Sequence, residues 1–258
     1  MKIYEFGDKN KPVLLLLPGT CFTWNGNFGH VIEGLKEHFL VACVSYDGFD
    51  ETEQTEFSSM LEETEKIEDY VKKHYGGEIH AAYGCSLGGS FVGLLISREN
   101  IKIQHGIIGS SDMDETGKLK AKVLTKLAMQ IIYNFIQNGG FKSRLMKRFY
   151  DKRMLKRGEY GQKMMQMMGI GVRDLSFITK RSVENQFYSD MVTALPEKMD
   201  VPGTTIHVFY ALKMGEKYRG RYERYFKNPD IIEMDLEHEE LLILYPEEWI
   251  ARVVETVL

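Results

Sequence analysis

Apolar positions along the chain alternate between short continuous runs and helical spacing. Continuous apolar runs of about four to eight residues are typical of strands that are buried on both faces of a parallel sheet. Apolar residues that return every third or fourth position predict helices that cover such a sheet. The regular alternation of the two patterns predicts an α/β fold, with a mostly parallel sheet flanked by helices and joined by right-handed crossovers.

The predicted strands are rich in apolar, β-competent side chains and span residues 2–6, 12–17, 40–46, 78–83, 101–108, 204–210 and 231–236. The predicted helices cover residues 28–38, 57–75, 87–97, 216–226 and the chain from 246 onward. Between the fifth and sixth strands the helical spacing continues without a strand pattern. The sequence therefore predicts a core in two parts, residues 1–113 and 201–258, interrupted by a helical lid at residues 114–200.

The most informative stretch is Gly84-Cys85-Ser86-Leu87-Gly88, which joins a predicted strand to a predicted helix. A G-x-S-x-G motif between strand and helix is typical of a nucleophile elbow. The sharp turn strains the backbone of Ser86 and needs small residues two positions away on either side, which Gly84 and Gly88 supply. We expect Ser86 to be a nucleophile above the sheet, and Cys85 to be a small buried apolar residue.

The candidate base is His238, which directly follows the predicted strand at residues 231–236. Loops beyond the carboxyl ends of parallel strands share one rim of the sheet, so His238 and Ser86 can meet there. A serine hydroxyl is a poor nucleophile until a nearby base takes its proton. The other six histidines fall inside predicted strands and helices or at their edges, where we expect structural roles.

These pieces together resemble the α/β-hydrolase family over nearly the whole chain. The matching segments are PVLLLLPGT at residues 12–20, GCSLGG at 84–89 and the tail from residue 231 to 258. That family carries Ser, acid and His in this chain order, and a helical lid interrupts its sheet where this chain does. Glu237 is a departure, since relatives usually have glycine before the histidine.

The resemblance implies a serine hydrolase, most closely a carboxylesterase that cleaves small or medium acyl esters through an acyl-enzyme at Ser86. The alternative is a non-catalytic or acyl-transferring binding protein on the same scaffold. This alternative is kept because a catalytic triad of Ser, acid and His needs a carboxylate, and the position where relatives usually carry that carboxylate holds Met214.

Two carboxylates could serve instead. Asp112 follows the strand at residues 101–108, from which some branches of the family take their acid, and it is the favoured candidate. Glu216 lies two residues beyond Met214 and is the alternative. Each also has a purely structural interpretation, because Asp is common in turns and an acid is favoured at a helix start.

The oxyanion hole implied by the resemblance combines the Leu87 N–H with an amide of the loop after the second predicted strand. Thr20 is the first candidate for that amide and Cys21 the alternative. Losing one such donor typically costs about 10²–10³ in rate. We also expect Phe22 and Trp24 to form a wall of the acyl pocket.

Composition narrows the class of protein further. Hydrophobic content of 43% and charged content of 27% are ordinary for a soluble globular protein, and the net charge of −4 indicates little about partners. Residues 117–163 are rich in Lys and Arg, which favours a lid whose basic face is exposed to solvent. The alternative is that this basic face attracts anionic substrates or membrane surfaces. No nucleic-acid-binding module accompanies this charge, so nucleic acid is not an expected partner.

The remaining signals concern location and cofactors. The N-terminus has no long apolar segment, and no stretch approaches the roughly 18 apolar residues of a membrane span. Cys21, Cys43 and Cys85 lack motif spacing and are predicted to be free thiols in the cytoplasm. There is no metal-ligand cluster and no dinucleotide glycine pattern. The sequence thus predicts no metal, no organic cofactor and a small-molecule ester as substrate.

Overall fold

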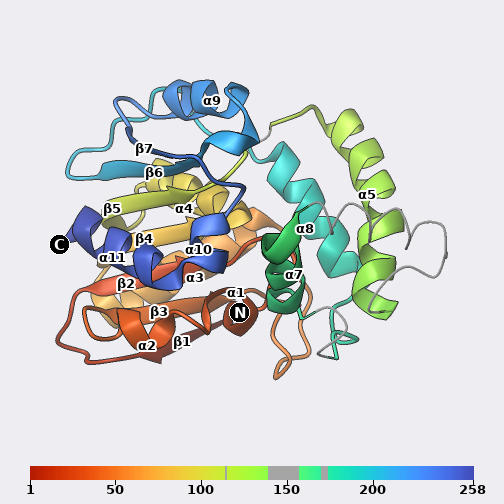
Figure 1. The fold of residues 1–258 in the computed structure, drawn as a ribbon, viewed down its shortest axis with the longest axis horizontal. Helices are drawn as coiled ribbons and strands as arrows, with labels where there is room; N and C mark the ends of the chain where they lie inside the picture. The colour runs from red at the N-terminus through yellow and green to blue at the C-terminus, as the bar shows by residue number, and fades with distance from the viewer. Residues whose placement is uncertain (114, 139–156, 170–173) are drawn as a thin grey trace.

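A seven-stranded sheet forms the centre of the computed structural model, which describes residues 1–113, 115–138, 157–169 and 174–258. The strand order is β1-β3-β2-β4-β5-β6-β7 (Figure 1). Only β1 runs antiparallel to its neighbour, so the predicted mostly parallel sheet is confirmed. The strands are β1 Lys2–Phe6, β2 Val13–Leu17, β3 Leu40–Ser45, β4 Glu78–Cys85, β5 Lys102–Gly109, β6 Thr205–Ala211 and β7 Asp230–Met234.

Helices cover both faces of the sheet, as expected for strands that are apolar on both sides. One face packs against α3 (Met60–Tyr75), α4 (Leu87–Arg98) and α9 (Lys217–Tyr225). The other face packs against the short helices α1 (Trp24–Phe28) and α2 (Ile32–Leu35) and against α11 (Pro246–Val257). Successive residues of β2 point to opposite faces, so that Leu15 and Leu17 join the first core and Leu14 and Leu16 the second.

The predicted helix at residues 28–38 is wrong. The chain instead forms two short helices, α1 at Trp24–Phe28 and α2 at Ile32–Leu35. The Thr23 hydroxyl accepts from the Gly26 N–H and starts α1 earlier than the apolar spacing indicates. Gly29 then follows α1 directly, and glycine is a poor helix former.

Capping sets the bounds of α3, which carries the chain to the central strand. The Ser59 hydroxyl accepts from the Glu62 N–H at the first turn, and Gly76 ends the helix in the left-handed conformation at φ 66°. Glycine adopts that conformation without a steric penalty. The break places β4 directly after the helix, at the middle of the sheet.

The described residues between β5 and β6 form the helices α5 (Lys118–Asn138), α7 (Gly158–Met167) and α8 (Lys180–Val192). They gather beyond one end of the strands (Figure 1). Residues 139–156, which hold much of the basic charge of the predicted insertion, lie outside the described residues. The division of the chain into core and lid stays a prediction.

Three neighbouring histidines form a row across β4, β5 and β6. His80 on β4, His105 on β5 and His207 on β6 have ring centroids 5.2 and 5.4 Å apart in succession. His105 Nδ1 lies 3.2 Å from His207 Nε2, and His207 Nδ1 lies 2.9 Å from an Asp230 carboxylate oxygen. Burial and the two neighbouring imidazoles lower the pKa of His105.

This row predicts a pH-dependent stability. A histidine whose pKa is lower in the folded state binds fewer protons than in the unfolded chain, so the folded state loses stability as pH falls below about 6.5. We expect His105→Asn to show a smaller loss of unfolding free energy than the wild type between pH 8 and pH 5. Urea denaturation across that pH range measures the difference. Equal losses of unfolding free energy in the two proteins would contradict a lowered pKa of His105 as the cause.

Candidate active site

Ser86 stands on the turn between the last residue of β4 and the first residue of α4. Its backbone has φ 50° and ψ −111°, a strained conformation for a residue with a side chain. A Cβ on Gly84 would lie 2.1 Å from the carbonyl of Gly88, and one on Gly88 would lie 2.0 Å from the Leu17 carbonyl oxygen. The strained serine and its two compact neighbours are the local geometry of a nucleophile elbow.

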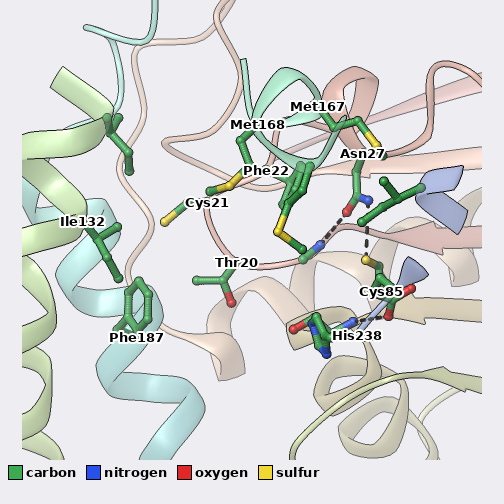
Figure 2. A pocket seen from close by; sticks show the side chains of 16 residues that line it. Thr20, Cys21, Phe22, Asn27, Cys85, Ile132, Met167, Met168, Phe187 and His238 are labelled. Atoms are coloured by element: carbon green, nitrogen blue, oxygen red, sulfur yellow. Dashed lines mark hydrogen bonds between the residues drawn. The ribbon is translucent and has the colours of Figure 1, made fainter. Parts of the chain in front are cut away.

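A cavity of about 360 Å³ opens above Ser86. Its walls come from the loop after β2, the elbow, the helices between β5 and β6, and the segment after β7 (Figure 2). Most of its lining side chains are apolar: Phe22, Ile132, Ile136, Met164, Met167, Met168, Phe187 and Ile243. Its polar floor includes Thr20, Ser86, His238 and Glu239.

His238 lines the same cavity as Ser86, beyond the end of β7. Burial lowers the pKa of His238, and the neighbouring Glu239 offsets only part of this effect. The imidazole is therefore neutral at neutral pH and able to accept a proton. The Tyr160 hydroxyl of α7 donates to the His238 backbone oxygen at 2.7 Å and anchors the segment. The Ser86 hydroxyl and the His238 ring make no direct hydrogen bond in this structure; in enzymes without substrate such bonds are often long and tighten when substrate binds.

The loop after β2 presents one free amide toward the cavity. The Cys21 N–H donates to Gln186 Oε1 of α8 at 2.8 Å, so it is already engaged. Within the described part of the chain, the Thr20 N–H has no hydrogen-bond partner. The Leu87 N–H begins α4 and has no partner within that helix. Of the two loop candidates, the structure therefore favours Thr20 over Cys21.

Neither candidate acid lines the cavity. After β5 the chain is fastened to α9, since the Tyr222 hydroxyl donates to the Ser111 carbonyl and Arg221 donates to the Asp112 carbonyl. Asp112 is thereby held on the side of α9. Glu216 is exposed at the start of α9. The structure does not bring either carboxylate to the cavity that holds His238.

The expectation that Trp24 forms part of the acyl pocket is wrong, whereas Phe22 does line the cavity. The indole of Trp24 stacks on Tyr4 with ring centroids 4.6 Å apart and lies 5.4 Å from the ring of Phe6. Both partners belong to β1, so Trp24 covers the edge of the sheet. The early start of α1 turns it there.

Sequence reasoning missed Glu239, which lines the cavity beside His238 and is only 6% exposed. Its Oε1 accepts from the Ser86 N–H at 3.0 Å, and its Oε2 accepts from the Tyr83 hydroxyl at 2.8 Å. Burial raises the pKa of Glu239, while His238 and both donors oppose that rise. The only signal in the sequence is its place directly after His238, within an acidic run typical of a solvated surface.

Cys85 also lines the cavity, yet its chemistry is not that of a nucleophile. The Asn27 side chain links two groups (Figure 2). Its Oδ1 accepts from the Gly19 N–H at 2.8 Å, and its Nδ2 donates to the Cys85 sulfur at 3.4 Å. Burial raises the pKa of the Cys85 thiol well above its usual range, so the thiol stays protonated at neutral pH.

Two features that the described residues lack bear on other classes of protein. No group of three or more His, Cys, Asp or Glu side chains in the described segments is placed to hold a metal ion. No described helix combines the length and the apolar character needed to cross a bilayer. Cys21, Cys43 and Cys85 are all buried free thiols.

Comparison with known proteins shows the fold. No protein-family model matches the sequence, and no curated protein matches it either. Among solved structures, a Desulfitobacterium hafniense protein assigned to the alpha/beta hydrolase family aligns with a TM-score of 0.76 at 18% identity, over 100% of both chains. A marine microorganism esterase aligns with a TM-score of 0.71 at 15% identity, over 100% of this chain and 98% of its own. MenH from S. aureus aligns with a TM-score of 0.70 at 14% identity, over 98% of this chain and 96% of its own.

The elbow between β4 and α4 and the seven-stranded sheet thus define an α/β-hydrolase fold. The expected fold class is confirmed.

Proposed function

We propose that this protein is a serine hydrolase, most closely a carboxylesterase that cleaves small or medium acyl esters. One observation carries the proposal: a serine in a strained elbow and a histidine with a lowered pKa line the same apolar cavity. A buried neutral imidazole beside a serine hydroxyl is the arrangement that makes the hydroxyl nucleophilic.

The reaction would begin with attack of Ser86 Oγ on the ester carbonyl carbon, while His238 takes the hydroxyl proton. A carbon–oxygen bond forms, and the carbonyl electron pair moves onto its oxygen. The Thr20 and Leu87 amides would hold this oxyanion, because neither N–H group has a hydrogen-bond partner among the described residues and α4 directs its positive end toward the elbow.

Collapse of the tetrahedral intermediate then expels the alcohol, which takes the proton from His238 and leaves an acyl group on Ser86. Water enters, gives its proton to His238 and attacks the acyl carbon. The second intermediate releases the carboxylic acid as the proton returns to Ser86 Oγ. Each half-reaction uses the same base and the same oxyanion donors.

The cavity supports an acyl group of modest size. Its volume of about 360 Å³ is at the small end of the range typical for ligand sites. Ile132 and Ile136 of α5 and Phe187 of α8 give the walls an apolar character suited to an alkyl or aromatic acyl chain. The methionines of α7 are flexible enough to adapt to different chains.

Labelling with a fluorophosphonate tests the proposal. We expect the wild-type protein to be labelled at a single peptide that contains Ser86, and to hydrolyse p-nitrophenyl esters of two to eight carbons in preference to longer ones. A non-catalytic binding protein would stay unlabelled and inert toward every ester. That result would overturn the proposal. An acyl-transferring enzyme would also be labelled, but its acyl-enzyme would react with an added alcohol or thiol in preference to water.

A further inference from the structure

An imidazolium forms on His238 once in each half-reaction of the proposed mechanism, and it needs a negative charge nearby. In the Ser-His-Asp arrangement a buried aspartate supplies it. Here Met214 occupies the usual place, and Asp112 and Glu216 lie away from the cavity. Among the described residues, Glu239 is the carboxylate that lines the cavity together with His238.

The backbone and its neighbours hold Glu239 in one position. Its φ of 57° is the left-handed conformation, which turns its side chain back under the elbow at the start of α10 (Glu240–Leu244). Its own N–H donates to the Ser110 hydroxyl at 3.3 Å. Its two carboxylate oxygens accept from different donors, the Ser86 N–H and the Tyr83 hydroxyl.

These two donors can satisfy both oxygens of an ionised carboxylate. A carboxylate is an acceptor on both oxygens, whereas a protonated carboxyl group must donate from one of them. A buried charge is expensive unless it is hydrogen-bonded and paired. The hydrogen bonds are present in the structure, and His238 is the neighbouring group that can become its positive partner.

We propose that Glu239 does the work of the triad acid: held beside the Ser86 backbone by the Ser86 N–H and the Tyr83 hydroxyl, its carboxylate stabilises the His238 imidazolium. The proposal rests on the serine hydrolase function. The proton taken from Ser86 stays on His238, and Glu239 stays ionised throughout. The Ser110 backbone is a second group that favours the imidazolium, because it also raises the pKa of His238. Glu239 is thus a positioning residue that acts through His238.

The experiment compares pH profiles of ester hydrolysis for the wild type, Glu239→Gln and Glu239→Asp. Gln keeps the size and one acceptor oxygen but removes the charge, so we expect kcat to fall about 10²–10³-fold with little change in KM. The acidic limb of the profile should move to lower pH, because the charge that raises the pKa of His238 is gone. Asp restores the charge and should restore most of the rate.

Two control variants separate this role from others. Glu240→Gln makes the same change one residue further along, at a carboxylate that accepts from the Glu237 N–H, and should leave kcat and the limb unchanged. Asp112→Asn tests the rival acid. A large loss in Asp112→Asn together with a near-normal Glu239→Gln would overturn the proposal, as would a fall in kcat without movement of the limb.

Two further measurements keep the outcome decisive. Fluorophosphonate labelling of wild-type Ser86 tests the proposed function by itself, so a labelled protein with an unaffected Glu239→Gln variant refutes this inference alone. If Glu239→Gln does not fold by circular dichroism, Tyr83→Phe removes one donor to the carboxylate and favours its neutral form. We then expect kcat to fall about tenfold with the limb again moving to lower pH; an unmoved limb would refute the proposal.

Discussion

Ser86→Ala should lower kcat for ester hydrolysis by about 10⁴–10⁶-fold and leave KM nearly unchanged. The loss is this large because the acyl group has no other acceptor: Cys85 is buried and protonated, and its sulfur is engaged by Asn27. His238→Ala should cost a similar factor, since the nucleophile and its base act as one unit. The double variant should therefore be no worse than either single one.

Steady-state kinetics on a p-nitrophenyl ester measures these effects. Ser97→Ala is the matched control, because Ser97 lies on the same helix as the elbow and only donates to the Leu94 carbonyl. Its kcat should equal that of the wild type. An Ser86→Ala variant that kept more than about a hundredth of the wild-type kcat would show that another residue carries the chemistry.

Gly88→Ala should destroy the elbow. The added methyl group would lie 2.0 Å from the Leu17 carbonyl oxygen and 2.8 Å from its carbonyl carbon, both in the backbone of β2. Neither α4 nor the central sheet can move without breaking strand hydrogen bonds, so we expect a loss of about 3 kcal/mol in unfolding free energy and no labelling of Ser86. Thermal melting and the labelling assay measure the two effects.

Gly220→Ala is the control for this substitution. Gly220 lies within α9, and a Cβ there would meet nothing within 4 Å. Alanine is the better helix former, so we expect the variant to be more stable by about 0.5–1 kcal/mol and fully labelled. Comparable losses in Gly88→Ala and Gly220→Ala would show that the elbow imposes no special steric demand.

The elbow could be predicted from the sequence because its requirements are local. A strand, a sharp turn and a helix within residues 78–98 fix which positions need glycine, and Ser86 follows from them. The strand boundaries could be predicted for a similar reason, since a strand buried on both faces must be apolar along its length. The apolar spacing predicts a helix from residue 28, but the Thr23 cap starts α1 earlier, at Trp24.

The charge near His238 could not be predicted in this way. Glu239 belongs to the run Glu237-His238-Glu239-Glu240, and this local sequence does not indicate which of the three carboxylates is buried. The difference arises from Tyr83 and Ser86, which lie more than 150 residues away along the chain and supply its donors. Likewise, contacts with α9 hold Asp112 away from the cavity.

The sequence by itself determined the order of strands and helices, the strained serine and the class of chemistry that a hydroxyl on such a turn supports. These depend on side chains a few positions apart. Only the tertiary structure decided which acid is near the histidine, which loop amide is free and what encloses the cavity. Those features depend on burial, and burial is set by the packing of segments that are distant in the chain.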